Sequence, residues 1–321
     1  MTLRELGRSG LKVSPLCFGG NVFGWTADEK TSFELLDAWV GAGFNFIDTA
    51  DTYSRWVPGH KGGESEAVIG RWLAQGGGRR DKLVIATKVG MDLSKGPGLA
   101  PARIREAADE SLKRLGVDRI DLYQAHQDDK DTPLEDTLGA FADLVKAGKV
   151  RAIGASNYTA PRLAEALGVS RKLGLPRYES LQPLYNLYDR AGFEVELQPL
   201  CVKENVGVIN FYALAAGFLT GKYRTPEDAG KSKRGTSTIG KYLNERGLKV
   251  LAGLDEGSRR TGHNHARLAI AWNMSRPGVT SPIVSATSLA QLEDIVQAAR
   301  LTLDAATLEQ LDKASAWSRA G

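Results

Sequence analysis

The chain has 321 residues, a length that suits either two ordinary domains or one large β/α barrel. Hydrophobic residues make up 42% of it and charged residues 25%, which is enough apolar material for a large core and argues against disorder. Its 42 basic and 38 acidic residues give a net charge of +4 that is scattered along the sequence, so a nucleic-acid-binding surface is not expected.

Cysteine usage and apolar runs predict the cellular compartment. Cys17 and Cys201 are far apart, with no CxxC spacing and no neighbouring histidine, so we expect buried, reduced thiols rather than a disulfide or a zinc site. The N-terminus has no basic region followed by an apolar run, and nowhere are there about 18 consecutive apolar residues. These features predict a cytoplasmic protein that does not associate with membranes.

Short apolar runs alternate with amphipathic stretches of helix length along the whole chain. The candidate strands are residues 16–18, 44–48, 83–88, 120–125, 150–156, 180–183, 207–211 and 281–284. The candidate helices are residues 28–42, 64–75, 101–115, 133–147, 161–173, 194–206, 258–276 and 290–298. This alternation is typical of α/β folds with a parallel sheet, and eight βα units predict a single (β/α)8 TIM barrel with residues 1–321 as one domain.

Two segments lie outside the βα repeat. Residues 3–6 and 11–13 flank the sequence Gly-Arg-Ser-Gly at residues 7–10, which predicts a β-hairpin that closes the bottom of the barrel. Residues 221–247 follow the seventh strand and are rich in Lys, Arg, Gly, Ser and Thr. A long segment at this place predicts a functional loop.

Polar side chains follow four of the predicted strands where each strand ends. Asp48, Lys88 and His126 stand at or directly after the ends of the second, third and fourth strands, and Ser156-Asn157 ends the fifth. Each residue alone is commonly a turn cap, a solvated charge or a structural group. Because the carboxyl ends of barrel strands converge over one mouth, we interpret them together as a site.

The chemistry of such a site depends on Tyr53, five residues after Asp48. An unperturbed tyrosine has a pKa of about 10, so it donates a proton to a carbonyl oxygen readily only if positive charge lowers that pKa. Lys88 could supply the charge, and Asp48 could hold the ammonium group in a partly desolvated site. His126 could then orient the carbonyl oxygen.

These residues resemble the aldo-keto reductase family, and the resemblance covers nearly the whole chain. Asp48 and Tyr53 stand in Phe-Ile-Asp-Thr-Ala-Asp-Thr-Tyr, Lys88 in Ala-Thr-Lys-Val-Gly and His126 in Leu-Tyr-Gln-Ala-His. The resemblance implies reduction of an aldehyde or ketone, or the reverse oxidation, with Tyr53 as general acid or base. It also implies that Lys88 and Asp48 depress the pKa of Tyr53, that His126 binds the carbonyl, and that a nicotinamide supplies hydride.

No GxGxxG run follows a predicted strand and opens a helix, so the cofactor must bind without a Rossmann motif. The resemblance assigns the nicotinamide carboxamide to three residues with amide or hydroxyl groups, ring stacking to an aromatic residue, and the phosphates to basic residues of the long loop. The implied cofactor residues are Gly20, Asn21, Asp48, Ser156, Asn157, Gln182, Phe211, Tyr212, Leu214, Lys222, Arg234, Ser285, Thr287 and Gln291.

The segment after the eighth strand bears on the choice between NADP and NAD. It opens a helix whose N-terminus can hold an anion, and it offers Thr287, Ser288 and Gln291 where NADP-selective family members often carry Arg or Lys. We expect NADP(H) as the preferred cofactor, with NAD(H) as the alternative.

The substrate is expected to be a small carbonyl compound or alcohol, with Trp25 and Trp56 as candidate apolar walls near Tyr53. Variable loops form such walls, so the sequence leaves the substrate and the oligomeric state open. One alternative function is an NADPH-binding regulatory or sensor subunit, as in the potassium-channel β-type members of the family. Another is a metal-dependent barrel enzyme, but only His126 among the histidines lies at a strand end, so no metal site is predicted.

Overall fold

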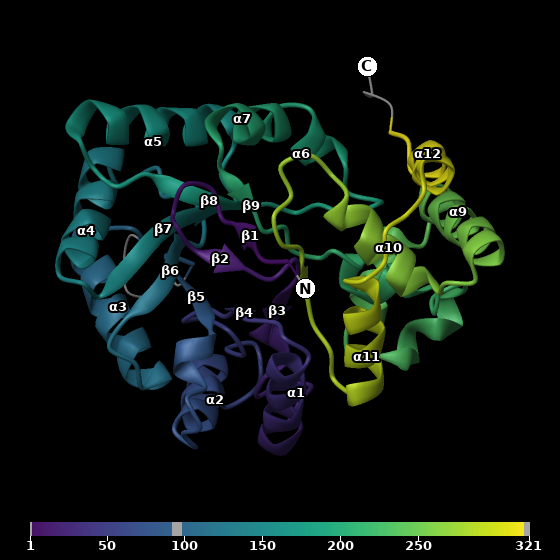
Figure 1. The fold of residues 1–321 in the computed structure, drawn as a ribbon, viewed down its shortest axis with the longest axis horizontal. Helices are drawn as coiled ribbons and strands as arrows, with labels where there is room; N and C mark the ends of the chain where they lie inside the picture. Colours follow the sequence, from purple (N-terminus) through teal and green to yellow (C-terminus); the bar gives the residue numbers. More distant parts are fainter. Residues whose placement is uncertain (1, 92–97, 318–321) are drawn as a thin grey trace.

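The computed structural model describes residues 2–91 and 98–317, and its central element is a sheet of eight parallel strands (Figure 1). These strands are β3 (Cys17–Gly19), β4 (Phe46–Asp48), β5 (Val84–Val89), β6 (Ile120–Ala125), β7 (Val150–Ser156), β8 (Tyr178–Gln182), β9 (Gly207–Val208) and β10 (Ile283–Val284). From β3 to β9 each strand pairs with the next along the chain, and β10 pairs with β3.

Backbone hydrogen bonds join the two remaining edges of the sheet. The Ile283 N–H donates to the Asn210 carbonyl oxygen over 2.9 Å, and the Ser281 N–H donates to the Val208 carbonyl oxygen over 3.1 Å. The sheet therefore closes on itself, and the predicted (β/α)8 barrel is confirmed.

Helices surround this sheet. They are α1 (Glu29–Gly41), α2 (Glu64–Leu73), α3 (Pro101–Leu115), α4 (Leu134–Lys146), α5 (Ala160–Leu173), α6 (Ala191–Glu194), α7 (Leu197–Glu204), α8 (Gly235–Tyr242), α9 (Glu245–Thr261), α10 (His265–Met274), α11 (Leu289–Ala298) and α12 (Ala305–Ala314). Local chemistry sets several ends: the Thr159 side chain caps α5 by accepting from the Arg162 N–H, and Pro101 opens α3.

The structure differs from the predicted helices in the C-terminal half. The single helix expected over residues 258–276 is two helices, because Gly262 (φ 74°) ends α9 and Asn264 caps α10. The helix expected over residues 194–206 is divided into α6 and α7, and α12 lies beyond all the predicted helices. The long segment after β9 is not a plain loop, since it contains α8 and a 3₁₀ turn at Pro226–Lys231.

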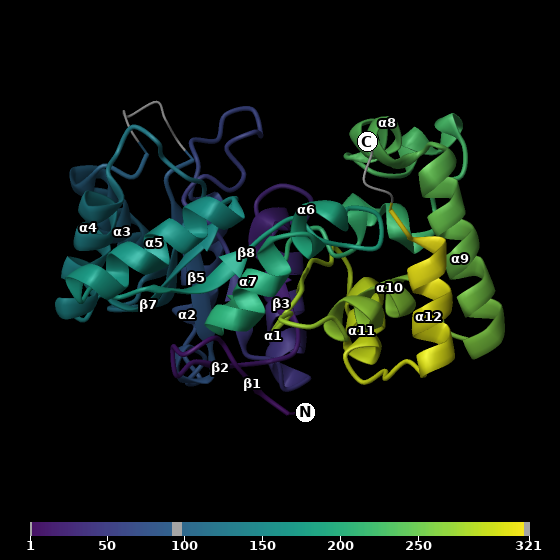
Figure 2. The same cartoon turned by 90° about the horizontal axis from the view of Figure 1, so that it is seen from above.

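The N-terminal hairpin pairs β1 (Arg4–Glu5) with β2 (Lys12–Val13) in antiparallel fashion, as predicted. Figure 2 shows this hairpin at the lower edge of the view and α8 at the upper edge. Three hairpin residues join an apolar cluster inside the barrel, so the hairpin closes the end away from the polar strand ends. The cluster consists of Leu6, Leu11, Val13, Cys17, Phe46, Val84, Ala86, Leu122, Ala152, Ile209 and Ile283.

A second and larger cluster lies between the strands and the helices and includes the fully buried Trp39, Trp72 and Trp272. Successive residues of a strand point to opposite faces, so neighbouring residues such as Cys17 and Phe18 of β3, or Phe46 and Ile47 of β4, belong to different clusters. Both cysteines are buried and unpaired, as expected.

Candidate active site

Three of the predicted catalytic residues meet at one cation. The Lys88 ammonium lies 2.5 Å from Asp48 Oδ2 and donates to the Tyr53 hydroxyl over 2.9 Å. It also donates to the carbonyl oxygen of Thr49 over 2.8 Å. Lys88 and Asp48 are fully buried, whereas Tyr53 is half-buried and its hydroxyl faces the buried pair.

Burial dominates the acidity of Tyr53. It raises the pKa of Tyr53 to about 12, against the lowering effect of the Lys88 charge, and Asp48 raises that pKa further. The expectation that Lys88 and Asp48 both depress the pKa is therefore corrected, because only the lysine does so. Burial alone would lower the pKa of Lys88, but Asp48 and Tyr53 outweigh it and raise that pKa, so the ammonium stays charged.

His126 lies beside Tyr53 in the site. Its ring centroid lies 6.0 Å from that of Tyr53. Burial, assisted by the Lys88 charge, lowers the pKa of His126 well below its ordinary value, so the imidazole is neutral at neutral pH. Its buried Nδ1 has no hydrogen-bond partner among the residues that the structure describes. A neutral imidazole with an unused nitrogen can bind a carbonyl oxygen or an ordered water.

The second carboxylate oxygen of Asp48, Oδ1, contacts Gln124, a residue that the sequence did not single out. Asp48 Oδ1 accepts from Gln182 Nε2 over 2.9 Å and from Gln124 Nε2 over 3.1 Å. Gln182 was expected only at the cofactor carboxamide, and Gln124 was not considered. Strand periodicity could have found Gln124, since it stands two residues before His126 and so faces the same side of the sheet.

The predicted carboxamide residues are neighbours at the ends of β7 and β8. Ser156 Oγ donates to the Gln182 carbonyl oxygen over 2.8 Å. Asn157, with a positive φ of 56°, donates from Nδ2 to the His126 carbonyl oxygen over 2.9 Å. These contacts place the amide and hydroxyl groups beside the catalytic candidates, where they could face a carboxamide.

Residues from three distant parts of the sequence meet on the other side of the mouth. The Asn21 amide lies among Gly19, Ser285 and Arg234, and with its oxygen toward Arg234 it accepts from that guanidinium. Burial lowers the pKa of Arg234, and no Asp or Glu in residues 2–91 or 98–317 forms an ion pair with it. A largely buried cation without a carboxylate is suited to bind a phosphate.

The other predicted cofactor residues lie in two segments nearby. After β9, Phe211 packs against Tyr212 with ring centroids 5.3 Å apart, and Tyr212 has a positive φ of 58°. Leu214 is half-buried, and Lys222 stands just beyond this turn. After β10, the Thr287 N–H and hydroxyl both donate to Gln291 Oε1 at the start of α11. Gly20 opens the 3₁₀ turn Gly20–Val22 directly after β3.

The two candidate substrate residues form an aromatic row that begins at Tyr53. The Trp56 ring lies 6.1 Å from the Tyr53 ring, and the Trp25 ring lies 5.5 Å from the Trp56 ring, both edge to face. The Arg234 guanidinium covers Trp25 at 4.7 Å. Trp56 is 47% exposed, so this row offers apolar surface to a bound molecule.

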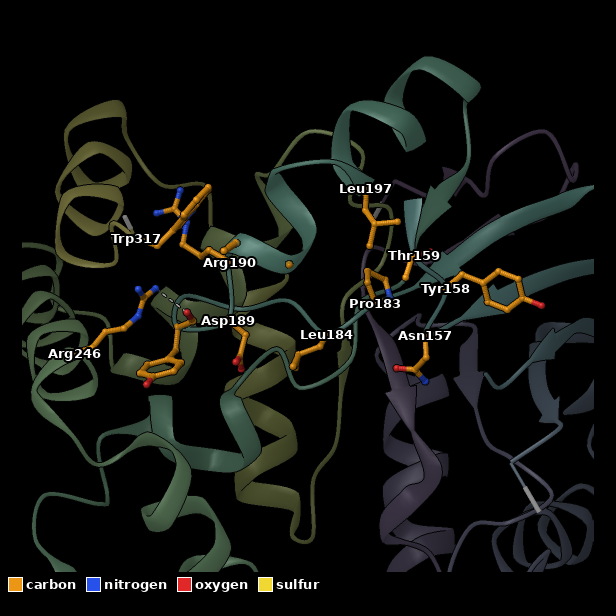
Figure 3. Close-up of a pocket in the computed structure, with 13 residues that line it drawn as sticks. Asn157, Tyr158, Thr159, Pro183, Leu184, Asp189, Arg190, Leu197, Arg246 and Trp317 are labelled. Carbon is orange, nitrogen blue, oxygen red and sulfur yellow. Dashed lines mark hydrogen bonds between the residues drawn. The ribbon is translucent and has the colours of Figure 1, made fainter. Parts of the chain in front are cut away.

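A cavity of about 590 Å³ lies beside the barrel mouth (Figure 3). Asn157 and Leu184, after β7 and β8, line one side, and Arg246 and Trp317 line the other. Within the described chain, none of the four catalytic candidates lines it. Asn157 connects the two places, because it also contacts His126.

Two further searches concern the described part of the chain. No helix there is long and apolar enough to cross a membrane. No group of three or more His, Cys, Asp or Glu residues there is arranged to hold a metal ion.

Comparison with known proteins relates this geometry to a family. Residues 15–316 match the family model described as "Aldo/keto reductase family". The chain is 38% identical to the uncharacterized oxidoreductase YrpG of Bacillus subtilis over 97% of this chain and 95% of that protein. It is 33% identical to a probable voltage-gated potassium channel subunit beta of Arabidopsis thaliana, covering 93% and 91% of the two chains.

The L-glyceraldehyde 3-phosphate reductase of Escherichia coli (strain K12) is 32% identical over 98% of this chain and 92% of that enzyme. The family model, over residues 15–316, includes every strand of the barrel, and these relatives cover nearly the whole chain. The chain belongs to the aldo/keto reductase family.

Proposed function

We propose that the protein catalyses the NAD(P)H-dependent reduction of an aldehyde or ketone to an alcohol, or the reverse oxidation, with Tyr53 as the general acid or base. The observation that carries this proposal is the 2.9 Å hydrogen bond from the Lys88 ammonium to the Tyr53 hydroxyl. A cation at this distance stabilises the phenolate that forms when Tyr53 gives up its proton.

Each of the four side chains has a separate task in this reaction. In the reduction, Tyr53 transfers its hydroxyl proton to the carbonyl oxygen as the oxygen gains negative charge. Lys88 stabilises the phenolate that remains, and Asp48 holds the Lys88 ammonium in place over 2.5 Å. The neutral His126 donates a hydrogen bond to the same carbonyl oxygen and thereby orients it.

A bound nicotinamide supplies or accepts the hydride in this reaction. Asn157, Ser156 and Gln182 would hold its carboxamide, and Phe211 would stack on its ring. Arg234, together with Asn21 and Ser285, would hold the phosphate groups, and Lys222 would assist. The mostly buried guanidinium of Arg234 forms no ion pair with a carboxylate of the described residues, which supports this assignment, since an anion would neutralise it. We propose NADP(H) as the preferred cofactor and NAD(H) as the alternative.

For the substrate we propose a small carbonyl compound that packs against Trp56 and Trp25. The E. coli relative is named for the reduction of L-glyceraldehyde 3-phosphate, so short aldehydes are a suitable first panel. Plant relatives are named as probable channel subunits. The regulatory alternative is less favoured for this chain, because Asp48, Lys88 and Tyr53 are already joined by short polar contacts around one buried ammonium.

Replacing Tyr53 by phenylalanine tests the proposal. We expect Tyr53→Phe to lower kcat for a reactive aldehyde by about 10²–10⁴-fold, since a positioned acid contributes a factor of this size. Nicotinamide binding, followed by protein fluorescence quenching with NADPH and NADH in parallel, should be unchanged. Turnover equal to that of the wild type would rule out Tyr53 as the proton donor, and equal affinities for the two nucleotides would contradict the NADP preference.

A further inference from the structure

Gln124 is a fully buried residue of β6 whose side chain connects two parts of the site. Its Nε2 donates to Asp48 Oδ1 over 3.1 Å, and its Oε1 accepts from Gln182 Nε2 over 3.3 Å. Gln182 also donates to Asp48 Oδ1 over 2.9 Å. The three side chains, from β4, β6 and β8, therefore form a closed triangle of hydrogen bonds inside the barrel mouth.

The two oxygens of Asp48 have different partners. Oδ2 contacts the Lys88 ammonium at 2.5 Å and the Tyr53 hydroxyl at 3.4 Å, whereas Oδ1 accepts only amide donors among the described residues. A carboxylate can rotate about its Cβ–Cγ bond, so donors that hold Oδ1 also determine where Oδ2 lies. The position of Oδ2 in turn determines where the Lys88 ammonium lies, because the two atoms are in direct contact.

The sheet is built to accommodate the Gln124 side chain. In the strand register, Gln124 stands between Lys88 on β5 and Gly154 on β7. A Cβ atom at Gly154 would lie 3.2 Å from Gln124 Cγ and 2.2 Å from Ser180 Oγ. A larger residue at position 154 would therefore clash with Ser180 and press against Gln124. The glycine leaves room for the long polar side chain on its neighbour.

We propose that Gln124 is a positioning residue that holds Asp48 and Gln182 as one hydrogen-bonded unit. It couples the Lys88–Tyr53 pair to the amide expected to face the nicotinamide carboxamide. This inference rests on the proposed function, because it assigns Gln124 to the support of the proton-donating group. Gln124 itself touches neither the substrate nor the reacting atoms.

Two variants test the role of Gln124. Gln124→Leu places an apolar side chain at this buried position and removes both hydrogen bonds. We expect kcat to fall by about tenfold or more, as for the loss of a hydrogen bond to a charged acceptor, while KM for the carbonyl substrate changes by less than about threefold.

Gln124→Glu provides a readout that a merely structural role would not change. A protonated carboxyl at this position copies the amide, since it can donate to Asp48 and accept from Gln182. When ionised it repels Asp48, and that repulsion together with burial raises its pKa. We expect this variant to be active in acid and to lose activity as the pH rises toward neutrality, a dependence absent from the wild type.

Tyr123→Phe is the matched control. Tyr123 is the preceding residue of β6 and faces the helices, and its buried hydroxyl has no hydrogen-bond partner in the described chain. We expect wild-type kinetics from it. A kcat for Gln124→Leu within twofold of the wild type, or a wild-type pH profile for Gln124→Glu, would overturn the inference. If Gln124→Leu does not fold, the pH profile of Gln124→Glu decides. Full activity of Tyr53→Phe would instead contradict the proposed function, because Tyr53 could then not be the proton donor.

Discussion

Asp48 and Glu66 are two fully buried carboxylates that differ in what surrounds them. Asp48 contacts the Lys88 ammonium, which is itself fully buried and bonded to a tyrosine hydroxyl. Glu66, on α2, accepts from Arg114 Nε over 2.7 Å and from Thr87 Oγ1 over 2.5 Å. Each site combines a carboxylate with one cation, but only the Asp48 site also contains a group that can release a proton.

One strand supplies both sites. Thr87 and Lys88 are consecutive residues of β5, so their side chains point to opposite faces of the sheet. Lys88 reaches the barrel interior, and Thr87 reaches the helices. A lysine ammonium is a compact charge that can lie beside a phenolic oxygen, whereas the planar guanidinium of Arg114 suits carboxylates. We therefore propose that the inner pair, Asp48 and Lys88, takes part in the reaction, whereas the outer pair, Glu66 and Arg114, stabilises the fold.

The outer pair is part of a larger charged network that returns to the catalytic segment. Arg114 also contacts Glu110 at 3.7 Å, Glu110 contacts Arg103 at 3.6 Å, and Arg103 contacts Asp51 at 3.6 Å. Asp51 lies between Asp48 and Tyr53 in the sequence. The network therefore ties α2 and α3 to the loop that carries the proposed proton donor.

The largest effect on activity is expected from removing the Lys88 ammonium, the cation inside the barrel. Lys88→Met should lower kcat for carbonyl reduction by about 10²–10⁴-fold, because the phenolate of Tyr53 loses the charge that stabilises it. Steady-state kinetics with NADPH and a short aldehyde measure this. Lys149→Met, at an exposed ion pair with Asp109, is the control and should behave as wild type. A decrease in kcat of less than tenfold for Lys88→Met would contradict a catalytic role for the Asp48–Lys88 pair.

The outer pair should respond in stability rather than in activity. We expect Glu66→Gln to lower the free energy of unfolding by about 2–3 kcal/mol, near the lower end of the range for breaking a buried pair, because Arg114 is partly exposed and keeps Glu110. Its kcat should stay within about fivefold of the wild type. Denaturant unfolding measures the change, with Glu106→Gln, at an exposed carboxylate, as the control. A large decrease in kcat with an unchanged free energy of unfolding would contradict this prediction and would indicate that Glu66 takes part in catalysis.

The smallest effect is expected from the protonation of His126, which should leave kcat/KM unchanged between pH 8 and pH 6. Because the pKa of His126 lies well below its ordinary value, the imidazole should stay neutral over this interval, and kcat/KM should show no inflection near pH 6.5. In the unfolded chain, His126 binds a proton at about pH 6.5, whereas in the folded chain it does so only at a lower pH. The contribution of His126 to the free energy of unfolding is therefore fully present above about pH 6.5 and declines as the pH falls below that value. An inflection near pH 6.5 that disappears in His126→Asn would show the imidazole to be charged.

Much of the site could be predicted because it depends on strand ends. Asp48, Lys88 and His126 end or directly follow consecutive parallel strands, and such ends must meet at one mouth whatever the surrounding helices do. The break between α9 and α10 was also readable in principle, from Gly262 followed by Asn264, although the sequence analysis expected one helix over residues 258–276.

The sequence by itself determined the order of the eight strands and which polar residues stand at their ends, because alternation and turn residues act over a few positions. Tertiary structure alone decided that Gln124 and Gln182 hold Asp48, that Arg234 covers Trp25, and that burial raises the pKa of Tyr53. Hydrogen bonds across the barrel and the desolvation of a charge depend on atoms far apart in the chain. Local patterns carry no information about either.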